Sequence, residues 1–204
     1  MCSYNSIPPA MMKGPHNKIF LPFLLLFVCL VSALDPRGAR AEEAEIRDVL
    51  ITNTTEQVLV YFRVTDCFTE EMEEAIHAGI PTTFTFTIEL HRKRGFWWDK
   101  LEFAREIKHT IKYDNVKKLF YVAFTEDGKR PEQFTDFAEA KTAMSDVNGV
   151  AIMPLRNMIR GSTYYLRAKA ELEAVKLPLH LEYVFFFVSL WDFETEWITK
   201  EFVY

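Results

Sequence analysis

A strict alternation of apolar and polar side chains constrains the fold of this chain more than any other feature. Between Gly79 and Asp99, four large apolar residues alternate with threonine or glutamate: Phe84, Phe86, Ile88 and Leu90. A period of two places all four side chains on one face of an extended strand. That face needs a second layer of structure to cover it, so the rest of the chain must pack against this strand.

The same alternation recurs along the chain and predicts further strands. We expect them at residues 45–52, 58–64, 101–113, 119–125, 150–154, 163–174 and 193–202. Two short helices are predicted in the connections, one after the capping residue Thr69 and one from Thr135 or Asp136 to about Ser145. Residues 180–191 are almost wholly apolar but too few to span a bilayer, and they fit a short helix or a buried strand, with the helix favoured.

Closely spaced strands with only two small helices predict a mainly β fold. The interpretation is a single antiparallel β-sandwich-like domain with two short helices in its connections. Strands and helices do not alternate regularly, which argues against a parallel sheet. An open sheet with helices packed on one face is the alternative.

The N-terminal residues are typical of an export signal. Lys13 and Lys18 precede an uncharged apolar stretch at residues 19–34, and Ala39-Arg40-Ala41 offers a small-x-small cleavage site. We expect residues 1–41 to be a signal peptide and residues 42–204 to be one extracytoplasmic, periplasmic domain. The alternative is an uncleaved anchor in the inner membrane formed by residues 19–34. Met1, Met11 and Met12 are all candidate start residues.

Charge and cysteine content exclude some classes of function. The net charge is −5, and removal of the more basic signal region leaves the remaining domain more negative still. An acidic domain without a basic footprint argues against nucleic-acid binding. Cys67 is the only cysteine after residue 41, so no internal disulfide can form, and its position at the end of an alternating strand predicts a buried thiol rather than a reactive one.

Catalytic and metal-binding patterns are not found in the sequence. The histidines after residue 41 do not stand at metal-ligand spacing, and no serine lies in a Gly-x-Ser-x-Gly elbow. Glu194 and Glu196 are two residues apart, as paired acids would be, but on an acidic protein this spacing usually marks a solvated face. We therefore predict no cofactor, no metal site and no enzymatic activity.

The strongest functional feature is a basic and aromatic cluster that follows the central strand. Its candidate binding residues are Arg92, Lys93, Arg94, Trp97 and Trp98. Arg105 and His109 are added as residues that could extend the cluster or line a cleft. Cationic side chains beside tryptophans suit the headgroup zone of an anionic membrane or an acidic partner. The simpler interpretation is that the charges solvate a strand end while one or both tryptophans enter the core.

Four motifs together resemble a known family of exported proteins. They are Gly79-Ile80-Pro81 before the alternating strand, residues 94–98, residues 134–140 with their capped helix, and residues 191–197. In order and spacing they are similar to the family called domain of unknown function 4390, from Gram-negative bacteria. The resemblance implies an extracytoplasmic domain and transfers no catalytic residues. It also suggests, by gene neighbourhood, a membrane sensor kinase of the nitrogen-regulation type as a partner.

These observations predict a non-enzymatic, extracytoplasmic binding module. We expect it to contact a protein at the outer face of the inner membrane, with a sensor kinase as the candidate and the membrane surface as a further contact. A carrier of a small apolar ligand or lipid is the first alternative, motivated by 18 phenylalanines. An unrecognised hydrolase is the second.

Overall fold

Two antiparallel sheets make up more than half of the residues described by a computed structural model, which are 43–126, 128–173 and 193–204. The smaller sheet has three strands, in the order β1 (Glu45–Asn53), β2 (Gln57–Thr65) and β7 (Asp146–Pro154). The larger has six, in the order β6 (Glu132–Phe134), β5 (Leu119–Phe124), β4 (Lys100–Asp114), β3 (Thr82–Arg92), β8 (Thr163–Leu172) and β9 (Ile198–Val203). The short helices are α2 (Glu70–His77), α3 (Phe137–Ser145) and the 3-10 turn η1 (Leu155–Asn157). The prediction of a mainly β fold with antiparallel sheets and two short helices is confirmed.

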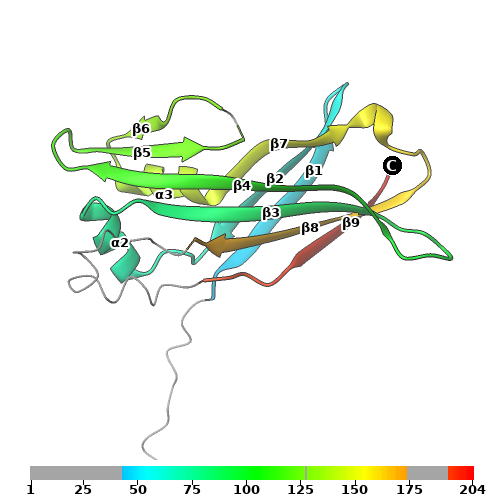
Figure 1. Cartoon of the computed structure of the whole chain (residues 1–204), viewed down its shortest axis with the longest axis horizontal. Helices are drawn as coiled ribbons and strands as arrows, with labels where there is room; N and C mark the ends of the chain where they lie inside the picture. Colours follow the sequence, from blue (N-terminus) through cyan, green and yellow to red (C-terminus); the bar gives the residue numbers. More distant parts are fainter. Residues whose placement is uncertain (1–42, 127, 174–192) are drawn as a thin grey trace, which may run out of the picture. The chain divides into compact units, whose positions relative to one another are not determined.

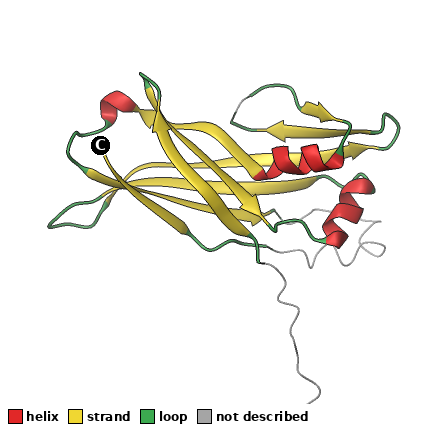
Figure 2. Cartoon of the chain, turned by 180° about the vertical axis from the view of Figure 1, so that it is seen from behind, coloured by secondary structure: helices red, strands yellow, loops and turns green. Residues whose placement is uncertain are grey.

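The core lies between the two sheets, where strands β1 and β2 cross the long strands of the larger sheet (Figures 1 and 2). Phe62 on β2 meets Phe86 on β3 edge to face, with ring centroids 5.9 Å apart. Both side chains are almost fully buried. Each buried side chain of this size contributes on the order of 1.5–3 kcal/mol to folding. Contact between the sheets therefore supplies much of the driving force for the fold.

Strand β3 is the central strand of the larger sheet, and its alternating sequence explains why. Its apolar face is completely buried, as the alternation predicted: Phe84, Phe86, Ile88 and Leu90 are all 0% exposed. Beside them on β8, Ala170 pairs with Phe86 and Ala168 with Ile88. Cores pack to nearly crystalline density and leave little free volume. The small alanines beside the large side chains of β3 therefore leave room for the side chains of the smaller sheet.

The helices begin where the sequence predicted. The Thr69 side chain accepts a hydrogen bond from the Met72 backbone N–H at 3.3 Å, and Asp136 accepts one from Glu139 N–H at 3.0 Å. Such caps satisfy backbone donors that a helix start leaves free. Helix α3 packs on β4 and β5, and α2 packs on β4. None of the described helices has the length and hydrophobicity needed to cross a membrane.

Two strand boundaries differ from the prediction. We predicted a strand at residues 150–154, but β7 begins at Asp146 and runs through Asn148-Gly149, a pair that is also typical of turns. Its register against β2 shifts between Val60 and Phe62, and Gly149 has a φ of +67°, so the glycine forms an irregularity inside the strand. The last strand is regular only from Ile198, with an isolated bridge at Glu194 before it. The predicted signal peptide and residues 180–191 fall outside the described residues.

Candidate functional site

The hairpin that joins β3 to β4 carries the candidate site at its turn, residues 93–99, which we call the tip. Phe96 is 99% exposed, Trp97 74% and Trp98 91%. We call these three side chains the aromatic tip. The interpretation that the tryptophans enter the core is wrong for both of them. Consecutive large aromatic residues held in water are costly to expose, and such exposed apolar surface usually marks a place of contact.

The base of the tip is fixed to the sheet even though its aromatic side chains are free. Asp99 accepts hydrogen bonds from the Arg94 backbone N–H at 3.2 Å and from the Tyr165 hydroxyl at 3.0 Å. The Lys93 backbone N–H donates to the Thr163 carbonyl at 2.9 Å, which extends the pairing of β3 with β8. The aromatic tip is therefore presented from an ordered base.

Most positive charges at the base are paired with carboxylates. Arg92 and Lys100 both bind Glu102, at 2.8 and 2.6 Å. Lys93 binds Glu201 on β9 at 2.5 Å. Burial alone would raise the pKa of Glu102, but the hydrogen bonds from its two cationic neighbours outweigh burial and lower the pKa below its ordinary value. Two of the three predicted cations thus brace the base.

Arg94 differs from its neighbours. Its side chain is exposed and makes no ion pair within the part of the chain that the structure describes. It directly precedes Gly95 and the aromatic tip in sequence. Of the cationic run, Arg94 is therefore the residue free to meet an external anion beside the aromatic rings.

A second loop lies at the same end of the domain, and sequence reasoning missed it. The connection from η1 to β8 reaches Thr163, which is bonded to Lys93 at the base of the tip. Together with η1, this connection carries three exposed residues: Arg156, Ile159 and Arg160. The sequence shows no periodicity at these residues, and only the adjacent Gly161 indicates a turn there. In the structure Gly161 has a φ of +75°. Their position becomes evident only once β3 and β8 are paired.

The family described as Domain of unknown function (DUF4390) matches residues 41–201. The chain belongs to this family. No curated protein and no solved structure matches it significantly. The match covers nearly the whole domain, including the tip, so the aromatic tip lies within the region that defines the DUF4390 domain.

Two predicted site residues, Arg105 and His109, lie away from the tip of this DUF4390 domain. Arg105 is half-buried on β4 and pairs in register with Ile88. His109 is 1% exposed and lies in the interior between two aromatic rings, with Phe86 at 4.8 Å and Phe124 at 4.7 Å. A side chain so deeply buried does not extend a surface patch.

The hydrogen bonds of His109 indicate how it is held. Nδ1 lies 3.0 Å from the Met144 carbonyl oxygen, and Nε2 lies 2.7 Å from a Glu126 carboxylate oxygen. A carbonyl can only accept, so Nδ1 carries a hydrogen and donates it. The contact between Nε2 and Glu126 then needs a second proton, on the ring or on the carboxyl group. The histidine thus ties β4 to α3 and to the chain after β5.

Cys67 fits the buried thiol that the sequence predicted. It is 4% exposed, and its Sγ lies 3.7 Å from the Val64 carbonyl oxygen. Burial raises the pKa of its thiol to about 12. A thiol in that state is not a nucleophile at neutral pH. Within the described residues, no group of three His, Cys, Asp or Glu side chains is arranged to hold a metal ion.

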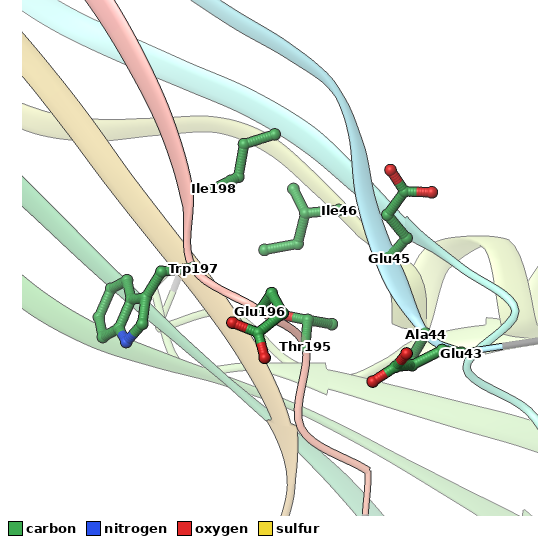
Figure 3. Close-up of a pocket in the computed structure, with 8 residues that line it drawn as sticks. All are labelled: Glu43, Ala44, Glu45, Ile46, Thr195, Glu196, Trp197 and Ile198. Atoms are coloured by element: carbon green, nitrogen blue, oxygen red, sulfur yellow. The ribbon is translucent and has the colours of Figure 1, made fainter.

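One groove of this DUF4390 domain is suited to a small ligand, and it lies between the start of β1 and the segment that leads into β9 (Figure 3). Its volume is about 410 Å³. Ile46 and Ile198 face each other across it, while Trp197 lies on the far side of its segment. Trp197 is covered there by the Arg167 guanidinium, 4.2 Å from the ring centroid. Acidic residues line the groove: Glu43, Glu45 and Glu196.

Proposed function

We propose that this DUF4390 domain is a non-enzymatic, extracytoplasmic binding module that docks at the outer face of the inner membrane. The observation that carries the proposal is the aromatic tip, three consecutive large aromatic side chains that are almost fully exposed on an ordered base. Tryptophan is enriched at protein contact sites and at membrane interfaces, because one ring combines a large apolar surface with a polar N–H.

The partner that we propose is a protein of the inner membrane, with a sensor kinase as the candidate. Support for the membrane location comes from the export signal that the sequence predicts. Support for the kinase comes from the family resemblance alone. The base of the tip is braced by ion pairs and hydrogen bonds, so binding requires little ordering of the backbone, and a preorganised surface loses less entropy on association.

Cross-linking in living cells tests the proposal. Lysine-reactive cross-linking followed by mass spectrometry should capture a membrane protein with the wild-type chain. Replacement of the aromatic tip by serine (F96S/W97S/W98S) should abolish that capture. Because these side chains are exposed, the substitutions should change stability by no more than about 0.5 kcal/mol. Circular dichroism and urea unfolding of the purified variant check that the fold is retained.

A matched control is available at the other end of β4. Val116 is 93% exposed in the turn between β4 and β5, so V116S removes exposed apolar surface from a second hairpin turn of the same sheet. Capture should survive this change. If the serine variant of the aromatic tip still captures the same protein as the wild type, the tip is not the docking surface and the proposal fails.

A carrier of a small apolar ligand is the second candidate, and the groove in Figure 3 is the observation in its favour. Its apolar floor includes Ile46 and Ile198, but its acidic residues would repel a fatty acid or an anionic lipid. Organic extraction of the purified protein followed by mass spectrometry tests this role. An extract without a stoichiometric lipid or other apolar molecule would contradict it.

A further inference from the structure

Exposed apolar side chains gather at the end of the domain that carries the tip. Besides the aromatic tip, Leu101 is 48% exposed, Ile159 49% and Val203 71%. Val203 on β9 pairs with Thr163, whose carbonyl accepts the Lys93 N–H. Leu101 is the second residue of β4, directly after the tip, and pairs with His91 on β3. These residues come from three separate segments, so the tertiary fold and not local sequence brings them together.

Three arginines at this end have no carboxylate partner within the described residues. They are Arg94 on the tip, Arg156 at η1 and Arg160 in the loop before β8. All three are exposed. The whole chain has a net charge of −5, so three exposed arginines without a carboxylate partner at one end of the domain run against its overall charge. We call the aromatic tip, Leu101, Ile159, Val203 and these arginines the tip end.

We propose that the tip end binds the surface of an anionic phospholipid bilayer. The arginines would bind headgroup phosphates, and the aromatic tip would enter the interfacial zone between headgroups and acyl chains. Guanidinium groups bind phosphate oxygens through paired hydrogen bonds, and tryptophan prefers the interfacial zone. This inference rests on the proposed function and names the surface on which the module docks, next to the membrane protein that it meets there.

The form of the tip end favours lipid over direct contact with a protein. A stable protein interface typically buries about 800 Å² on each partner in a closely complementary surface. A hairpin turn that projects three adjacent aromatic rings offers mainly those side chains. The surface of a lipid bilayer is fluid, so binding to it needs no complementary shape. Apolar side chains and cations favour that binding, and the tip end has both. Figures 1 and 2 show this hairpin reaching beyond the neighbouring strands.

Fluorescence quenching in vesicles tests the inference on the full chain. The protein carries four tryptophans, and none lies in residues 1–42, so an inserted N-terminal segment would contribute no tryptophan emission. Full-length protein would be incorporated into vesicles that contain bromine-labelled phosphatidylcholine, with or without the anionic lipid phosphatidylglycerol, which gives the vesicle a negative surface potential. Subtracting the W97F/W98F variant isolates the emission of the two tip residues.

We expect strong quenching of the tip tryptophans in anionic vesicles and weak quenching in neutral ones. The charge-reversed variant R94E/R156E/R160E should lower the ratio of docked to undocked tips by at least roughly 100-fold, since loss of each arginine near an anionic surface removes about a fivefold factor and each new carboxylate adds repulsion. Salt should weaken the wild-type effect, because it screens exposed charges. A matched control reverses three exposed cations at the opposite end of β4 and should leave quenching unchanged: K112E/K117E/K118E.

The outcomes separate this inference from the proposed function. Quenching that is absent from anionic vesicles, or that survives reversal of the three arginines, overturns the lipid inference. If the aromatic tip is still needed for protein capture in cells, the proposed function then stands and the occupant of the tip is the protein itself. If capture and quenching are both absent, both proposals fail.

Discussion

Removal of His109 should destabilise the domain strongly, although the sequence places this residue among the candidate binding residues. In H109A the Met144 carbonyl and the Glu126 carboxylate both lose their partner in the interior. Glu126 has little capacity to compensate, because its second oxygen is already buried without a hydrogen-bond partner among the residues that the structure describes. The contacts with Phe86 and Phe124 are lost as well.

The magnitude follows from these losses. Leaving one partner of a buried ion pair without the other costs about 3–5 kcal/mol, and leaving a neutral buried hydrogen-bonding group without its partner costs about 1–3 kcal/mol. Typical domains are stable by about 5–15 kcal/mol, so H109A would lose a large fraction of the total. Replacing both partners by apolar residues, as in H109L/E126L, removes the unpaired groups. This double variant should therefore be destabilised by less than the sum of the two single variants H109L and E126L.

Urea unfolding followed by far-UV circular dichroism measures these differences, and the slope with urea should stay constant if only stability changes. A loss below about 1 kcal/mol for H109A would refute the reasoning, since it would lie below the cost of even one unsatisfied buried group. So would strict additivity of the two single variants, because residues that share a buried hydrogen bond must couple.

Three further predictions concern residues away from that pair. The Cys67 thiol, with a pKa raised to about 12, should resist Ellman's reagent at pH 8 in the folded protein and react at once in urea; fast labelling of the native state would contradict its burial. Glu102 has a lowered pKa when folded, so its contribution to stability is present above its ordinary pKa and is lost as pH falls through the folded value. E102Q should thus be less stable than wild type at pH 7, and the gap in unfolding free energy should narrow in acid. G149A should cost about 1–2 kcal/mol, because its φ is +67° and a new Cβ would lie 3.1 Å from the Tyr61 hydroxyl. G95A is the control, since a Cβ added at Gly95 would meet no described atom within 4 Å apart from its chain neighbours. Equal melting temperatures for the two variants would disprove the assignment of strain.

The elements that the sequence predicted correctly are those with a local physical cause. The alternation around Phe84 and Phe86 locates β3, and capping by Thr69 and Asp136 locates both helices. These features depend on neighbours within a few residues. The early start of β7 could not be predicted in the same way, because Asn148-Gly149 is also a favourable turn sequence, and only pairing with β2 keeps it extended.

The candidate site was predictable in part. The basic and aromatic run at residues 92–98 can be recognised in the sequence, but the exposure of the aromatic tip depends on how the rest of the chain packs around it. The same pattern does not reveal that Lys93 is paired while Arg94 has no ion pair among the described residues, because Glu201, the partner of Lys93, lies more than a hundred residues away. Arg160 joins the tip end for an equally non-local reason, through the pairing of β3 with β8.

The length of β3 and β4 has a mechanical consequence. Strand β3 has 11 residues and β4 has 15, and hydrogen bonds join β3 along most of its length to β4 on one side and to β8 on the other. At about 3.3 Å per residue, β3 extends roughly 36 Å from the tip. A force pulling on the tip along the strands would act as shear, perpendicular to those hydrogen bonds, and would load many of them at once. Tension from a membrane-bound tip would therefore be shared across the larger sheet instead of opening it one bond at a time.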